Sequence, residues 1–212
     1  MGRTRIKICG VRSIEIARAA VDAGADAVGF VFYKNSPRYI DPEEAFSILG
    51  KLPPMVTTVG LFVNASFDEY ADIEQYCPTD FGQLHGQETV KTARECGPRI
   101  IKAVRFEADT IRATLEQWAE VEEVDAILVD GSSGGQGVAL DWAALAAAKD
   151  AAGDKPLILA GGLTPENVAE AIRVVRPFAV DVSSGVETPG KPGEKDPERI
   201  LAFCAAVRSA DG

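Results

Sequence analysis

Residues 5–12 read RIKICGVR, a short run in which polar and apolar side chains alternate before a cysteine and a glycine. This alternation predicts a strand over Arg5–Cys9 that ends in a turn. An open dinucleotide-binding sheet of the Rossmann type requires a GxGxxG turn after its first strand. Cys9-Gly10-Val11-Arg12 does not supply that turn, so the stretch favours another way of combining strands and helices.

Short β-branched runs alternate with helical patterns along all 212 residues. The eight predicted strands are Arg5–Cys9, Ala27–Phe32, Thr57–Val63, Asp80–Leu84, Arg99–Val104, Ala126–Asp130, Leu157–Ala160 and Phe178–Val182. Eight unbroken βα units are typical of a closed (β/α)8 barrel, the TIM-barrel architecture of the α/β class. Because the length suits one substantial core and is slightly short for two, we predict a single domain over residues 1–212.

Three of the predicted helices share a start signal. Asp41-Pro42, Thr164-Pro165 and Asp196-Pro197 each place a capping oxygen before a proline at the first helical position. The apolar residues that follow the last two of these pairs recur at helical spacing, which predicts helices that pack against the sheet.

Composition limits the class of partner. The formal net charge is −10 and the lysines and arginines are scattered, which argues against nucleic acid and anionic membranes as partners. No apolar run approaches the length of a membrane helix, and the start of the chain lacks the apolar core of a signal peptide. The four cysteines show no CxxC spacing, which is typical of reduced thiols in the cytoplasm. His85 is the single histidine, which argues against a histidine-based zinc site and a Ser-His-Asp triad.

Two reactive side chains fall at predicted strand ends, where the active sites of such barrels lie. Cys9 ends the first strand and Asp130 ends the sixth. A free cysteine is more commonly a buried, inert hydrophobe. Asp130 could equally cap the turn Gly131-Ser132-Ser133. Spacing alone leaves both alternatives open.

Two loops after the seventh and eighth strands have the composition of a phosphate site. They carry Gly161-Gly162 and Ser183-Ser184, and this pair of loops is where many barrels bind phosphate. Glycine lets backbone N–H groups approach an anion, and serine adds hydroxyl donors. Gly135 and Gly137, after the sixth strand, could close the same pocket. The alternative is that the glycines only form tight turns.

Motifs in a fixed order extend over almost the whole chain: KICG, GADAVGFVFYKNSPRYI, VGLFVN, QLHG, DW, LAGGLTPENV and AVDVSSGVE. In these motifs the sequence resembles the phosphoribosylanthranilate isomerase family of tryptophan biosynthesis. The resemblance implies a cofactor- and metal-independent Amadori rearrangement of a small phosphosugar-anthranilate substrate, in a monomer or a homodimer. It implies that Cys9 is the general base and Asp130 the general acid.

The same resemblance suggests that Arg38 binds the anthranilate carboxylate and that His85 forms hydrogen bonds in the site, although a structural histidine is an alternative. Asp181, at the end of the eighth strand, is a further substrate-binding candidate and the second choice for the acid. Lys7 lies on the same strand face as Cys9, so it could stabilise a thiolate or form a salt bridge inside the barrel.

The chain also departs from the family pattern. Many members carry GTGKTFDW after the sixth strand, whereas this chain has Val138-Ala139 in place of the Lys-Thr pair. The segment Pro189–Asp196 is also longer than the usual connection to the last helix in this family. Other readings are a related phosphosugar isomerase and a catalytically silent phosphosugar-binding barrel. A metal-dependent epimerase would need more histidines, and a dual-substrate isomerase would place an aspartate at position 9.

Overall fold

The computed structural model of the chain describes residues 2–131 and 140–211. It contains a closed barrel of eight parallel strands in sequence order, which confirms the predicted (β/α)8 fold. The strands are β1 (Arg5–Cys9), β2 (Ala27–Val31), β3 (Thr57–Phe62), β4 (Phe81–Leu84), β5 (Ile100–Arg105), β6 (Val124–Asp130), β7 (Leu157–Ala160) and β8 (Ala179–Val182). The largest difference from the predicted bounds is at β6, which begins at Val124 rather than at Ala126.

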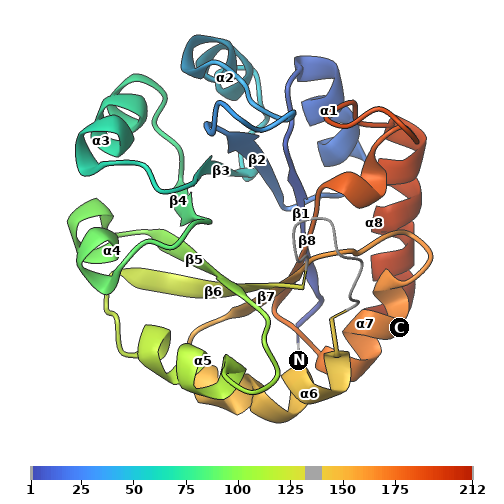
Figure 1. Cartoon of the computed structure of the whole chain (residues 1–212). Helices are drawn as coiled ribbons and strands as arrows, with labels where there is room; N and C mark the ends of the chain where they lie inside the picture. The colour runs from blue at the N-terminus through green and yellow to red at the C-terminus, as the bar shows by residue number, and fades with distance from the viewer. Residues whose placement is uncertain (1, 132–139, 212) are drawn as a thin grey trace.

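Helices surround the barrel as an outer ring (Figure 1). They are α1 (Ile14–Asp22), α2 (Pro42–Leu49), α3 (Phe67–Tyr76), α4 (Val90–Cys96), α5 (Ile111–Ala119), α6 (Trp142–Ala148), α7 (Val168–Val175) and α8 (Pro197–Asp211), with short 3-10 helices η1 (Lys149–Ala152) and η2 (Ser184–Val186). Among the described residues, none of these helices combines the length and apolar character needed to cross a membrane.

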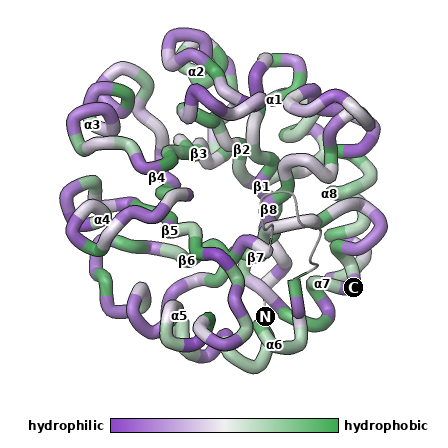
Figure 2. The backbone as a smooth tube through the Cα atoms, viewed as in Figure 1, coloured by the Kyte–Doolittle hydropathy of each residue, from purple (hydrophilic) through white to green (hydrophobic). Residues whose placement is uncertain are grey.

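Strand alternation divides the apolar side chains into two layers. Ile6 and Ile8 of β1 belong to the large core between the sheet and the helices. A smaller core fills the barrel interior, in which alanines such as Ala103, Ala126 and Ala179 make up half of the buried side chains and Val, Ile and Leu the rest. Hydrophobic residues accordingly follow the strands, while hydrophilic residues predominate in the connecting loops (Figure 2). Because Ile6 and Ile8 face outward, Lys7 and Cys9 face inward.

Two of the three predicted helix starts are confirmed. Asp41 accepts a hydrogen bond from the Glu43 N–H at 2.9 Å, with Pro42 in the first turn of α2. Asp196 accepts one from the Glu198 N–H at 2.9 Å at the start of α8.

The third prediction, at Thr164-Pro165, is right about the cap but wrong about the helix start. The Thr164 hydroxyl accepts a hydrogen bond from the Glu166 N–H at 3.2 Å, but residues 165–167 form a turn and helix α7 begins at Val168. The Asn167 side chain accepts from the Thr164 N–H at 2.8 Å and donates to the Gly162 carbonyl at 2.9 Å. The segment is therefore used to hold the preceding loop, and the regular helix starts after it.

Candidate active site

A pocket of about 280 Å³ opens at the carboxyl ends of the strands. The barrel brings most of the predicted site residues to it, although they are spread over much of the chain. Nine of them line this pocket: Cys9, Arg38, His85, Asp130, Gly161, Gly162, Asp181, Ser183 and Ser184. Gly135 and Gly137, and the unusual Val138-Ala139 pair, lie outside the described residues.

Cys9 is almost completely buried at the end of β1. Its thiol and the Lys7 ammonium both lie against Gly29 of β2. A Cβ atom at Gly29 would be 3.0 Å from the Cys9 Sγ and 3.2 Å from the Lys7 Nζ. Glycine therefore leaves the space that both side chains occupy. Sequence reasoning gave Gly29 no role, although a glycine inside a strand is a known sign of close approach.

Lys7 takes part in both of the interactions that the sequence allowed, a salt bridge inside the barrel and an electrostatic contact with the Cys9 thiol. Its Nζ donates to the Asp181 carboxylate at 2.8 Å, and both side chains are buried. Burial opposes its charge, but Asp181 and Cys9 outweigh that effect, so the pKa of Lys7 is raised and it stays protonated. Burial also raises the pKa of the Cys9 thiol, and the nearby Lys7 charge only partly offsets this. In the ligand-free site at neutral pH, Cys9 is therefore mainly a thiol.

His85 and Asp130 form the other polar pair in the pocket. The His85 Nε2 lies 3.2 Å from the Asp130 Oδ2, and the buried Gln83 Nε2 lies 2.7 Å from the His85 Nδ1. An amide N–H can only donate, so Nδ1 is the acceptor and the imidazole proton is on Nε2. The histidine therefore presents an N–H to Asp130. Gln83 was not singled out from the sequence, although it precedes His85 in the QLHG motif.

Arg38 lines the pocket, but one edge of its guanidinium is already occupied. Its Nε and Nη2 donate to the two Glu187 carboxylate oxygens at 2.7 and 2.9 Å. Lys195 also donates to Glu187, at 2.9 Å. Burial opposes ionisation of Glu187, but its hydrogen bonds to Arg38 and Lys195 prevail, so its pKa is lowered. Glu187 was visible in the SSGVE motif and Lys195 in the long segment after it, yet neither had a predicted role.

The loops after β7 and β8 lie against each other backbone to backbone. A Cβ atom at Gly185 would be 1.9 Å from the Leu163 carbonyl oxygen, so no side chain fits there. Gly161 and Gly162 have φ values of +84° and +68°, in the left-handed region that favours glycine. These features hold the predicted phosphate loops as one unit beside the pocket.

The two serines of this region differ in their availability. The Ser183 hydroxyl donates to the Cys9 carbonyl at 3.1 Å and accepts from Lys195 at 3.1 Å. Ser184 is exposed and begins η2. The Ser183 side chain therefore connects the phosphate loop to the end of β1, whereas Ser184 faces the pocket opening.

Comparison with known proteins completes the description of the site. Residues 6–206 match the family model described as N-(5'phosphoribosyl)anthranilate (PRA) isomerase. The chain belongs to the PRA isomerase family. A PRA isomerase of Moorella thermoacetica is 49% identical over 209 residues, covering 98% of this chain and 91% of the relative. One of Pseudomonas fluorescens is 50% identical over 210 residues, covering 98% and 100%.

Solved PRA isomerases have the same architecture. The structure from Thermotoga maritima is 42% identical and superimposes with a TM-score of 0.87, covering 97% of this chain and 99% of that one. A PRA isomerase in complex with reduced 1-(o-carboxyphenylamino)-1-deoxyribulose 5-phosphate is 41% identical, with a TM-score of 0.85 and the same coverage. The resemblance found in the sequence is thereby confirmed.

Proposed function

We propose that this chain isomerises N-(5-phosphoribosyl)anthranilate to 1-(2-carboxyphenylamino)-1-deoxyribulose 5-phosphate, with Cys9 as general base and Asp130 as general acid. The observation that carries the proposal is the common pocket of these two side chains. The same pocket reaches the glycine loops after β7 and β8. A substrate with a phosphate at one end therefore has an anion-binding surface, an acid and a base along one cavity.

The reaction begins with opening of the ribose ring. Asp130 transfers a proton to the ring oxygen as the bond from that oxygen to C1 breaks, and the anthranilate nitrogen lone pair forms a C1=N bond. The cationic Schiff base acidifies the proton on C2. The Cys9 thiolate takes this proton, the C–H electrons form C1=C2, and the C1=N electrons return to nitrogen. The enol then loses its O–H proton to solvent and C1 takes a proton from solvent, which gives the aminoketose. Asp130 regains a proton from solvent and Cys9 releases the one it took, so both groups return to their starting states.

Charged neighbours make this role possible for a buried thiol. Cys9 must be ionised to accept the proton, and burial disfavours that state. Lys7 and Lys195 both favour the thiolate electrostatically. We infer that the developing cation of the Schiff base adds to them, so that the thiolate is most favoured when the substrate is in place.

The remaining residues bind and orient the substrate. We assign the phosphate to the N–H groups around Gly161, Gly162 and Ser184, and to Gly135 and Gly137 of the loop after β6. We assign the anthranilate carboxylate to Arg38, through the guanidinium edge that Glu187 does not occupy.

The other two polar residues act on the reacting groups. Asp181, paired with Lys7, is placed to accept a hydrogen bond from a ribose hydroxyl. His85 holds the Asp130 carboxyl in position.

The decisive experiment is turnover by the purified chain, followed by loss of substrate fluorescence in the presence of a chelator. Conversion to the aminoketose, which has the same mass as the substrate and is identified by the ¹³C signal of its C2 ketone, is the expected result. Tight binding of the substrate without conversion would instead identify a silent phosphosugar-binding barrel.

The assembly and location of the protein are also inferred. One solved structure from Thermotoga maritima is described as monomers generated from a dimeric PRA isomerase. We infer that this chain acts as a monomer or a homodimer, since one chain supplies all the pocket residues named above. Sedimentation at assay concentration distinguishes the two. The four free, buried thiols are typical of a reducing compartment, which favours the cytoplasm.

A further inference from the structure

Behind the active site, a buried ion pair lies on the outer side of the barrel wall. Lys102 of β5 and Glu88, between β4 and α4, are 2.7 Å apart, and their side chains are only 3% and 2% exposed. Neither side chain lines the catalytic pocket. Replacing such a pair by apolar residues is often neutral or stabilising, because both charges lose their hydration. A contribution to stability is therefore a weak explanation for the presence of the Lys102–Glu88 ion pair.

The contacts of Lys102 suggest another reason. Its ammonium donates to the Leu84 carbonyl at 3.1 Å and to the Gly86 carbonyl at 2.9 Å, in addition to Glu88. These carbonyls belong to the residues on either side of His85. An ammonium has three hydrogens, and all three are used by these contacts. Lys102 thus binds the backbone on both sides of the histidine that faces Asp130.

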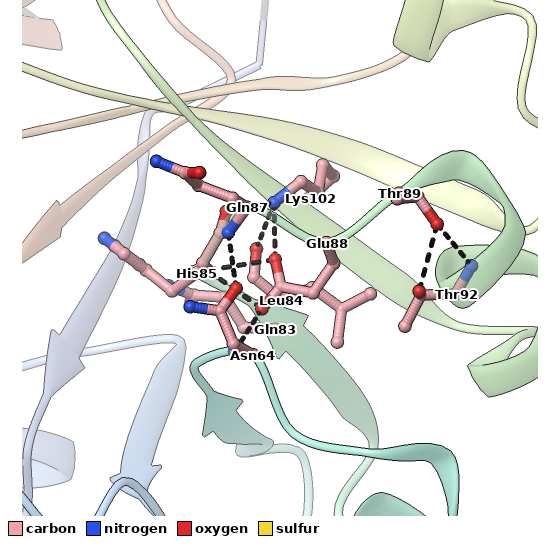
Figure 3. Close-up of polar contacts among 10 residues, drawn as sticks. Asn64, Gln83, Leu84, His85, Gln87, Glu88, Thr89, Thr92 and Lys102 are labelled. Atoms are coloured by element: carbon pink, nitrogen blue, oxygen red, sulfur yellow. Dashed lines mark hydrogen bonds and ion pairs between the residues drawn. The ribbon is translucent and has the colours of Figure 1, made fainter.

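Glu88 holds the same turn from the opposite direction. Its carboxylate accepts the Gly86 N–H at 2.9 Å and the Asn64 N–H, after β3, at 2.8 Å. The Asn64 side chain in turn accepts the Gln87 N–H at 2.7 Å. Figure 3 shows these contacts converging on Glu88 and Lys102. The network joins the carboxyl ends of β3 and β4 to the middle of β5, behind the catalytic pocket.

We propose that the Lys102–Glu88 pair is a positioning device that fixes His85 against Asp130. The inference rests on the proposed role of His85 in the isomerase reaction. The His85 backbone N–H is also bound, to the Phe62 carbonyl at 2.8 Å, so both peptide units of the residue are held. An imidazole on a restrained backbone keeps its 3.2 Å contact with Asp130 without reorganisation.

The test uses Lys102→Met/Glu88→Gln, which removes both charges together and leaves no unpaired buried ion. We expect kcat to fall by between about tenfold and a hundredfold, the cost of a misplaced catalytic group, with KM changed much less. Circular dichroism and thermal melting establish that the variant is folded. If it does not fold, Lys102→Gln/Glu88→Gln, which also removes both charges but keeps polar side chains of similar size, is measured in the same way.

A spectroscopic readout separates positioning from general destabilisation. His85 is the only histidine of the chain, so its imidazole gives one set of ¹⁵N signals. In the wild type these signals should report the tautomer whose Nε2–H faces Asp130. In the folded variant we expect them to move toward a mixture of tautomers. The matched control is Lys155→Met, because Lys155 also donates to two backbone carbonyls, Val121 and Val124, near the start of β6. It should leave kcat and the imidazole signals unchanged.

Two further outcomes keep the inference separate from the proposed function. A folded double variant with wild-type kcat and an unchanged imidazole spectrum would overturn the positioning role. Normal activity of His85→Asn would instead remove His85 from the reaction, while the imidazole spectrum of the double variant would still test whether the pair orients the ring.

Discussion

At the scale of single residues, the environment of Cys9 disfavours the thiolate, the form that a general base at this position requires. Cys9 is buried, and its raised pKa makes the thiolate the minor form. Lys7 and Lys195 oppose this effect from two sides, but each is also bound to a carboxylate, Asp181 or Glu187. In the ligand-free site Cys9 is therefore mainly a neutral thiol.

Cys9→Ser should lower kcat by about a hundredfold or more, the range expected for a lost general base, with little change in KM. Serine is nearly isosteric with cysteine but does not ionise near neutral pH. Steady-state kinetics measure the effect. Cys204→Ser is the matched control, because Cys204 is equally buried but lies on α8 in the helical layer. Activity of Cys9→Ser within a few-fold of wild type would make Cys9 a buried hydrophobe only.

Asp130→Asn should lower the single-turnover rate by roughly a hundredfold or more, because an amide cannot protonate the ring oxygen. A purely structural aspartate should tolerate the change with a loss of only about 1 kcal/mol of stability. Rapid-mixing kinetics are the appropriate measurement, since product release could limit kcat. A folded variant with a near-normal rate would exclude Asp130 as the acid and direct attention to Asp181.

Arg38→Ala should raise KM much more than it lowers kcat, because a carboxylate clamp binds ground and transition states alike. Glu187→Gln should have a smaller effect in the same direction, since it loosens the edge of Arg38 that Glu187 holds. Arg112→Ala is the control: Arg112 forms an exposed pair with Asp150 in the helical layer. An unchanged KM for a folded Arg38→Ala protein would show that Arg38 does not bind substrate.

At the scale of elements, β1, β6 and β8 bring Cys9, Asp130 and Asp181 to the pocket, and the loops after β7 and β8 line the same pocket. Alternation places Lys7 and Cys9 of β1 inside the barrel, while Ile6 and Ile8 pack against the helices. The loops after β7 and β8 act as one unit because Gly185 meets the Leu163 carbonyl. The segment after η2 folds back so that Lys195 reaches both Glu187 and Ser183.

Inorganic phosphate should inhibit the enzyme competitively through the loops after β7 and β8. Gly185→Ala should weaken this inhibition and raise KM, because the added Cβ forces the two loops apart. Gly50→Ala is a suitable control: Gly50 has a helical φ of −65°, and a Cβ there makes only an ordinary contact. If phosphate at tens of millimolar leaves the rate unchanged, the phosphate assignment is wrong.

At the scale of the whole molecule, the buried thiols make the free energy of unfolding depend on pH in the alkaline range. Burial raises the pKa of Cys77, Cys96 and Cys204 to about 11, and the pKa of Cys9 in the same direction. A group whose pKa is raised by folding loses its proton first from the unfolded chain. Each such thiol therefore favours unfolding once the pH passes the pKa of a free thiol, about 8.5.

The free energy of unfolding should accordingly be constant with respect to these thiols below about pH 8 and fall as the pH rises from about 9 to 11. Urea denaturation at several pH values measures it. Cys204→Ala should reduce the slope of this dependence, because one titrating thiol is removed, even though the variant is less stable at neutral pH. A slope that is identical in wild type and variant would show that Cys204 does not contribute.

The sequence by itself determined the eight βα units and the two reactive residues at strand ends. Local periodicity reports which face of a strand is buried, and parallel strands bring their carboxyl ends to one edge. For that reason Cys9, Asp130 and Asp181 could be predicted to share one edge of the barrel, whereas Arg38 and His85 were indicated by the family motifs. The family motifs added the reaction, but they did not indicate how the side chains are paired.

Only the tertiary structure decided those pairs. Lys7 meets Asp181 across 174 residues of chain, and Arg38 meets Glu187 across 149, because β1 closes the barrel against β8. On the other side of β1, the pairing with β2 places Gly29 directly opposite Cys9 and against its thiol. The turn that starts at Thr164 is likewise set by contacts and not by helix propensity, because the Asn167 side chain bonds the Thr164 N–H and the Gly162 carbonyl. Local patterns cannot specify such contacts, since each depends on where the closed barrel places a distant charge or backbone.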